Sequence, residues 1–284
     1  MILVTGATGT IGSEVVRQLV TSGQHPRALV RDPTTARQRL GGQVEPVVGD
    51  LDRPETIAAA LAGVDRVFLL TTQSAQQPQW EQGVIQAATR AGVGHLVKLS
   101  VFRADAQSPL QVARQHGQVE RALARSGLAY TVLRPVFFMQ NLLGMVRDGT
   151  IATATGNGRV AMVDARDIAA VAVAALGSHG HAGKVYTLTG PQALSFDEVA
   201  RIVSQQAGRQ LRHVRVLPDA VRDALQARGV AAWFAADMAK LHGMLAAGYE
   251  EIVTGDVRSV TGSPPRTLAR FAADFTGALT AWGA

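Results

Sequence analysis

Short apolar runs alternate with amphipathic stretches through the first half of the chain. The runs have the length of buried strands, and the stretches between them have the length and periodicity of helices. Strand–helix–strand units at this spacing form right-handed crossovers and a parallel sheet that helices cover on both faces. The predicted strands are 2–5, 27–30, 45–48, 66–70, 95–99 and 130–133, and the predicted helices are 11–22, 33–40, 54–61, 79–91 and 110–125.

The second half of the chain is less regular. We predict an α/β fold in which a Rossmann-type, doubly wound parallel sheet over residues 1–190 binds NAD(P). A smaller C-terminal α+β lobe over residues 191–284 is expected on the substrate side. The pattern predicts helices over 136–146, 167–176 and 195–207, strands over 184–188 and 213–216, and three further helices of which the last covers 265–279. The helix at 195 opens with the capping box Ser195–Glu198.

Composition narrows the classes of function. The 284 residues are 47% hydrophobic, which supports a sizeable core. The absence of cysteine excludes a disulfide scaffold, a thiolate zinc site and a cysteine nucleophile. The formal charge is +6 without any Lys/Arg block, so nucleic acid is not an expected partner. The longest apolar run, 168–176, is too short to span a membrane, and the start of the chain carries no charged leader, so we expect a cytoplasmic protein.

Three glycines follow the first predicted strand and open the first helix. Gly6, Gly9 and Gly12 supply a tight turn, close approach of the backbone to a diphosphate, and close packing of helix on strand. The helix N-terminus adds free N–H groups and the positive end of a dipole. We therefore expect a dinucleotide to bind at Gly6, Thr8, Gly9, Thr10, Ile11 and Gly12.

The spacing of these glycines is G-x-x-G-x-x-G, and several later segments agree with one family. Through the segments named below, the chain resembles the NmrA-like branch of the atypical short-chain dehydrogenases/reductases from residue 1 to about residue 215. The resemblance implies an NADPH-dependent reductase of quinones or dyes. The segments are 28–33 (ALVRDP), 49–51 (GDL), 127–135 (GLAYTVLRP), 164–169 (DARDIA) and 186–190 (YTLTG).

The end of the second strand bears on the choice between NADP(H) and NAD(H). Arg31 lies 19 residues beyond Gly12, where a cation can bind the 2′-phosphate of NADP. The alternative is that Asp32 binds the ribose of NAD(H). The resemblance implies an arginine at this place and hence NADP(H). It also implies cofactor contacts at Asp50, Leu51, Thr71, Thr72 and Gln73.

The catalytic residues are harder to assign. Ser100 ends the fifth strand, as in most short-chain dehydrogenases, but no tyrosine lies between Ser100 and Tyr130, so the family's Tyr–Lys pair is absent. Counted back from the GLAYT segment, His116 lies where the resemblance implies a functional lysine or histidine. Whether His116 donates a proton or only positions the cofactor is left open.

Apolar residues after the fifth and sixth strands are candidates for an acceptor pocket, although aromatic residues at helical spacing are also typical of a core. We predict hydride transfer to a small apolar or conjugated acceptor: a quinone, a carbonyl compound or a dye. The alternative is a non-catalytic NADP(H) sensor that acts through a protein partner. No metal is expected, and the oligomeric state, a homodimer included, is open. The pocket candidates are the apolar Phe102, Phe137, Phe138 and Met139, with Asn141 as the polar anchor.

Overall fold

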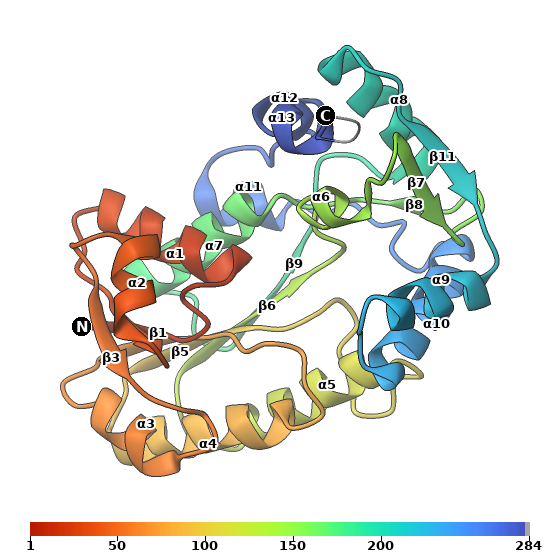
Figure 1. Ribbon diagram of the computed structural model, residues 1–284. Helices are drawn as coiled ribbons and strands as arrows, with labels where there is room; N and C mark the ends of the chain where they lie inside the picture. The colour runs from red at the N-terminus through yellow and green to blue at the C-terminus, as the bar shows by residue number, and fades with distance from the viewer. Residues whose placement is uncertain (282–284) are drawn as a thin grey trace. The chain divides into compact units, whose positions relative to one another are not determined.

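The computed structural model describes residues 1–281, and its largest element is a seven-stranded sheet in the order β3-β2-β1-β4-β5-β6-β9 (Figure 1). The strands from β3 to β6 pair in parallel. The inner strands are buried on both faces, which is why they are continuous apolar runs in the sequence. The strands are β1 (Ile2–Val4), β2 (Arg27–Val30), β3 (Glu45–Val48), β4 (Arg66–Leu69), β5 (His95–Leu99), β6 (Tyr130–Pro135) and β9 (Lys184–Leu188).

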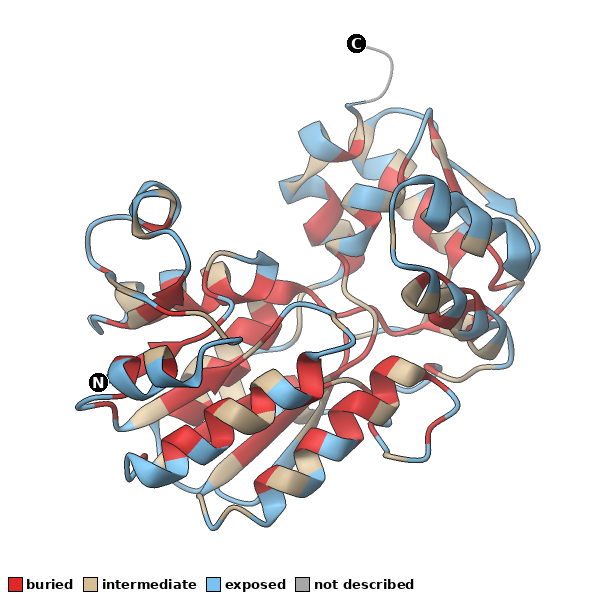
Figure 2. Cartoon of the chain, turned by 60° about the horizontal axis from the view of Figure 1, so that its bottom comes forward, coloured by how far each residue is buried: buried red, intermediate tan, exposed pale blue. Residues whose placement is uncertain are grey.

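Helices cover both faces of this sheet, with α1, α2 and α7 on one side and α3, α4 and α5 on the other (Figure 1). The strands β1, β2, β4, β5 and β6 are buried along most of their length, whereas the helices expose their outer sides (Figure 2). The doubly wound α/β fold is thereby confirmed. The helices are α1 (Thr10–Thr21), α2 (Pro33–Leu40), α3 (Pro54–Ala60), α4 (Gln77–Arg90), α5 (Gln111–Ala124) and α7 (Ala165–Gly177).

The chain divides into two compact units that are not consecutive in sequence. The first unit contains residues 1–108, 113–134 and 165–187, and the second contains 109–112, 135–164 and the chain from 188 onward. The predicted first domain, 1–190, therefore contains a segment, 135–164, that belongs to the second unit. This segment leaves the first unit because its apolar residues share a core with residues that follow 188. The shared core includes Met139, Leu142, Ile151, Val160, Phe196, Val199, Leu245 and Phe271.

The second unit has two small sheets, in which β7 pairs in parallel with β11 and β8 pairs antiparallel with β10. Its described helices after β11 number five, where the sequence pattern predicts three. The elements are α6 (Asn141–Met145), β7 (Thr150–Thr153), β8 (Arg159–Val160), β10 (Leu194–Ser195), α8 (Phe196–Ala207), β11 (Arg212–Arg215), α9 (Pro218–Ala227), α10 (Ala232–Ala246), α11 (Asp256–Thr261), α12 (Leu268–Asp274) and α13 (Thr276–Leu279).

Two helix predictions in this unit are wrong. The predicted helix 136–146 is reduced to α6, because Phe137 and Met139 instead exchange backbone hydrogen bonds with Val163. The predicted helix 265–279 is interrupted at Phe275, whose φ of −113° ends α12 and begins α13. Across residues 1–281, every helix is too short or too polar to span a lipid bilayer.

Candidate functional site

The glycine loop joins β1 to α1, and its three glycines have different surroundings. A Cβ on Gly6, whose φ is +60°, would lie 2.8 Å from the carbonyl oxygen of Leu70. A Cβ on Gly12 would lie 2.0 Å from the carbonyl oxygen of Gly6. Among the described residues, a Cβ on Gly9 would meet only that oxygen, at 3.4 Å. Gly6 and Gly12 are therefore required by packing, whereas Gly9 leaves open space where α1 begins.

The N-terminus of α1 has free hydrogen-bond donors. Gly9 caps the helix without a side chain, and the first turn contains no acidic residue. Within residues 1–281, no acceptor takes the N–H groups of Thr10, Ile11 or Gly12. Free N–H groups at the positive end of a helix dipole, next to open space, fit the diphosphate of a dinucleotide.

The residues after β2 separate the two cofactor hypotheses. Asp32 caps α2: one carboxylate oxygen accepts the N–H of Thr34 at 2.9 Å, and the other accepts the Thr35 hydroxyl. These bonds, the Thr35 hydroxyl first, lower the pKa of Asp32 below its usual value. Arg31 is exposed beside it. The arrangement favours Arg31 as a phosphate ligand over Asp32 as a ribose ligand.

The ends of β3 and β4 place the remaining cofactor candidates. Asp50 and Leu51 are half-buried after β3. Thr5 ties the end of β4 to the glycine loop, because its hydroxyl donates to the carbonyl oxygen of Leu70 at 2.7 Å and accepts the N–H of that residue at 2.8 Å. Thr72 and Gln73 follow, and both are exposed. The glycine loop and the end of β4 thus lie at one edge of the sheet.

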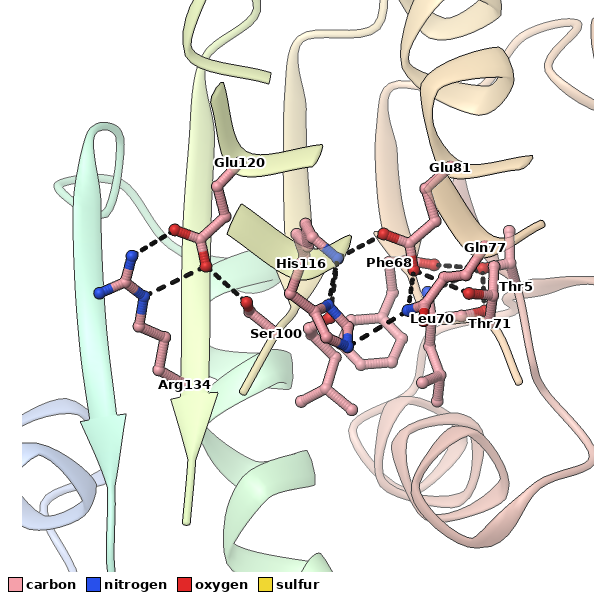
Figure 3. Close-up of polar contacts among 12 residues, drawn as sticks. Thr5, Phe68, Leu70, Thr71, Gln77, Glu81, Ser100, His116, Glu120 and Arg134 are labelled. Atoms are coloured by element: carbon pink, nitrogen blue, oxygen red, sulfur yellow. Dashed lines mark hydrogen bonds and ion pairs between the residues drawn. The ribbon is translucent and has the colours of Figure 1, made fainter. Parts of the chain in front are cut away.

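Ser100 is buried at the end of β5, and its hydroxyl is already engaged. It donates to Glu120 at 2.5 Å, and Glu120 forms an ion pair with Arg134. In the part of the chain that the structure describes, no hydrogen bond joins Ser100 to His116, which belongs to a second polar cluster (Figure 3). The catalytic role of Ser100 stays a prediction.

His116 lies on α5, 4% exposed, between two other elements. Its Nδ1 is 3.1 Å from Lys98 Nζ on β5, and its Nε2 is 3.2 Å from the side-chain nitrogen of Gln77 on α4. Lys98 Nζ and the Gln77 amide nitrogen are both donors, so the neutral ring accepts from only one of them and the other contact is not a hydrogen bond. Burial, and secondly the charge of Lys98, hold the pKa of His116 well below its usual value.

The charge of Lys98 is balanced by Glu81. Both side chains are fully buried and form an ion pair. Glu81 also accepts hydrogen bonds from the Thr71 hydroxyl at 2.7 Å and from Gln77 at 3.1 Å. Sequence reasoning missed Gln77, Glu81 and Lys98. Lys98 carried a signal, because a lysine inside a doubly covered apolar strand requires a buried partner.

The predicted acceptor residues are divided between the two units. Phe102 is buried in the first unit, at 9% exposure. In the second unit, Phe137 packs edge-on against Phe196, with ring centroids 6.1 Å apart, and Met139 lies in the hydrophobic core. These two surroundings favour the core interpretation, whereas Asn141 is exposed at the start of α6. The pocket, Phe138 included, stays a prediction.

No cluster of three metal-binding side chains is found among residues 1–281. Among these residues, three histidines have a side-chain partner at each ring nitrogen: His116, His181 and His213.

Comparison with known proteins agrees with this geometry. The NmrA-like family model matches residues 1–251. The chain is 43% identical over 276 residues to the NAD(P)H azoreductase of Xenophilus azovorans, covering 96% of each. The crystal structure of the NADPH-dependent quinone oxidoreductase of Escherichia coli with NADPH has 28% identity and a TM-score of 0.87, covering 97% of this chain and 99% of that one. The triphenylmethane reductase of Citrobacter sp. has 27% identity and a TM-score of 0.83, covering 96% and 99%.

Proposed function

Because the chain belongs to the NmrA-like family, we propose that it is an NADPH-dependent oxidoreductase that transfers a hydride to a small conjugated acceptor. The observation that carries the proposal is the open N-terminus of α1, where three N–H groups and the space at Gly9 can receive a diphosphate. The exposed Arg31 beside the occupied Asp32 supports NADPH over NADH.

The acceptor class follows from what the relatives have in common. The names of three relatives specify an azo compound, a quinone and a triphenylmethane dye. All three kinds of molecule are conjugated and give a stabilised product when they accept a hydride. A quinone, an azo compound, a conjugated carbonyl compound or a dye is therefore the substrate class we propose.

Each part of the first unit has a task in this reaction. The N–H groups of Thr10, Ile11 and Gly12 would hold the diphosphate, and Arg31 would neutralise the 2′-phosphate. When bound, the cofactor supplies the hydride. The chain lacks the Tyr–Lys pair, so its contribution is to orient the cofactor and acceptor and to exclude water. A stabilised product can take its proton from solvent.

The test is NADPH consumption by the purified protein with quinones, azo dyes, triphenylmethane dyes and conjugated ketones, with NADH in parallel. We expect turnover with at least one class and a preference for NADPH. Binding of NADPH without reduction of any acceptor would contradict the proposal and favour the sensor hypothesis. The cytoplasmic location stays a prediction, and the oligomeric state, a homodimer included, stays open.

A further inference from the structure

The loop between β4 and α4, residues 72–76, is held from α5. Gln115 on α5 donates its side-chain N–H groups to the carbonyl oxygens of Ser74, at 3.1 Å, and Ala75, at 3.4 Å. Gln115 is only 6% exposed, so these bonds are shielded from water. The loop itself exposes Thr72 and Gln73 at the edge of the sheet where the glycine loop lies.

Both ends of the same loop are bonded to one carboxylate. Thr71, which precedes the loop, and Gln77, which follows it, donate to the same oxygen of Glu81. The other oxygen of Glu81 is paired with Lys98. Glu81 therefore closes the loop at its base (Figure 3).

His116 joins this closure to α5. Its ring lies between Lys98 and Gln77, with a protein group within 3.2 Å of each nitrogen. A proton donor in reduction needs a nitrogen that faces the substrate and carries an exchangeable proton at working pH. Both nitrogens of His116 face protein groups instead, and the low pKa of the buried ring agrees with a neutral side chain.

We propose that Gln115 and His116 are positioning residues that hold the 72–76 loop in the shape that receives the cofactor, and that His116 is not the proton donor. The inference rests on the proposed function only in taking NADPH as the ligand of the loop. Two neighbouring residues of α5 contact the middle of the loop and Gln77, the residue that follows it, while Glu81 accepts from the residues on either side of the loop.

The experiment compares NADPH binding with turnover in matched variants. Gln115→Leu removes the two bonds to the loop and also a buried amide oxygen that has no hydrogen-bond partner among residues 1–281, so the variant is expected to fold. Gln118→Leu is the control, because Gln118 is exposed on the same helix. His116→Gln and His116→Leu test the contact between His116 and Gln77. Glutamine retains hydrogen-bonding groups at this position, and leucine does not.

We expect Gln115→Leu and His116→Leu to weaken NADPH binding about 10-fold in calorimetry, the equivalent of losing about one hydrogen bond. His116→Gln should recover part of this loss, and Gln118→Leu should bind as the wild type does. At saturating NADPH, kcat and its pH profile should stay within about threefold of the wild type in all four variants, because a general acid would be worth about 10²–10⁴-fold.

Other outcomes would overturn the inference. If His116→Leu binds NADPH normally but loses kcat, or loses a pH-dependent step that the wild type shows, His116 is a proton donor. If Gln115→Leu binds NADPH normally, the loop does not depend on α5. A wild-type protein that binds NADPH yet reduces no acceptor contradicts the proposed function alone, because the binding comparison is independent of turnover.

Discussion

The helices α1 and α8 are both 12 residues long, but their N-termini differ. The N-cap of α8 is Ser195, whose hydroxyl accepts the N–H of Glu198, while the carboxylate of Glu198 accepts the N–H of Ser195. Its first turn also contains Asp197. The N-cap of α1 is Gly9, which provides no side-chain cap, and the first turn of α1 contains no acidic residue.

The difference between the two N-termini shows that a helix N-terminus can either stabilise the fold or bind an anion. A capping box satisfies the first N–H groups and places negative charge at the positive end of the dipole, worth about 1 kcal/mol in stability. α1 forgoes this stabilisation, and its N–H groups remain available to an anion. The predictions below change each helix end in turn.

The largest effect is expected from Gly12→Ala. The new Cβ would lie 2.0 Å from the carbonyl oxygen of Gly6, a backbone atom that cannot move aside without moving the loop. We expect NADPH affinity to fall by more than about 100-fold, and stability to fall by about 1–3 kcal/mol from overpacking. Calorimetry and urea unfolding measure the two effects.

Gly83→Ala is the matched control for this substitution. Gly83 lies inside α4, and a Cβ there meets no atom within 4 Å in the part of the chain that the structure describes. It should leave NADPH binding intact and stabilise the protein by about 0.5–1 kcal/mol. If Gly12→Ala behaves like Gly83→Ala, the tight packing of the glycine loop is not needed for binding.

Thr10→Asp gives α1 the acidic first turn that α8 has. The carboxylate should stabilise the helix by about 0.3–1 kcal/mol but repel a diphosphate at the same N–H groups. We therefore expect higher stability together with weaker binding of both NADPH and NADH, by about 10-fold. This loss corresponds to the partly screened repulsion between one added carboxylate and the diphosphate. Thr10→Asn controls for shape. Unchanged affinity in the aspartate variant would mean that the diphosphate binds elsewhere.

Arg31→Ala sharpens the comparison by testing the part of the nucleotide that α1 does not reach. Loss of a charge-assisted bond should weaken NADPH binding by about 1.5–3 kcal/mol and leave NADH binding unchanged. Arg39→Ala, an exposed arginine in the last turn of α2, is the control. Equal loss of NADPH and NADH would show that Arg31 acts on the fold and not on the 2′-phosphate.

The N-termini of α1 and α8 could both be predicted from the sequence, because a glycine triplet and a capping box are local patterns. The strands β2, β3 and β5 and the helix α2 agree with their predicted bounds for the same reason. The α6 region was not predictable in this way. Its apolar residues satisfy a helical period, but backbone pairing with Val163, 24 residues beyond Met139, decides the conformation.

The buried polar cluster depends on contacts between distant parts of the chain. His116 was identified through a motif, but its partners lie on other elements: Gln77 and Glu81 on α4, and Lys98 on β5. No local pattern specifies which glutamate pairs with a buried lysine, since the pairing depends on which helix covers which strand. The partners of His116, and hence its role, could therefore not be predicted from the sequence.

Ser195→Ala opens the N-terminus of α8. We expect the free energy of unfolding to fall by about 1 kcal/mol, since the N–H of Glu198 loses its acceptor. NADPH binding should stay unchanged, because α8 belongs to the second unit and the glycine loop to the first. Weaker NADPH binding in Ser195→Ala would contradict the assignment of this helix end to stability.

The smallest effect is a pH dependence that the two helix ends do not share. Hydrogen bonding to the N–H of Ser195 lowers the pKa of Glu198 below its usual value, with a smaller contribution from Arg159. The stabilisation is thus present above the pKa of the unfolded chain and is lost as pH falls through the lower, folded value. Glu198→Gln keeps an acceptor but cannot titrate, so its stability should fall less between pH 7 and pH 3, by about a few tenths of a kcal/mol. Thr10→Asp should add a dependence of the same sign to α1, and urea unfolding across this range compares the two. A Glu198→Gln protein that loses as much stability in acid as the wild type would show that the α8 cap is not held by charge.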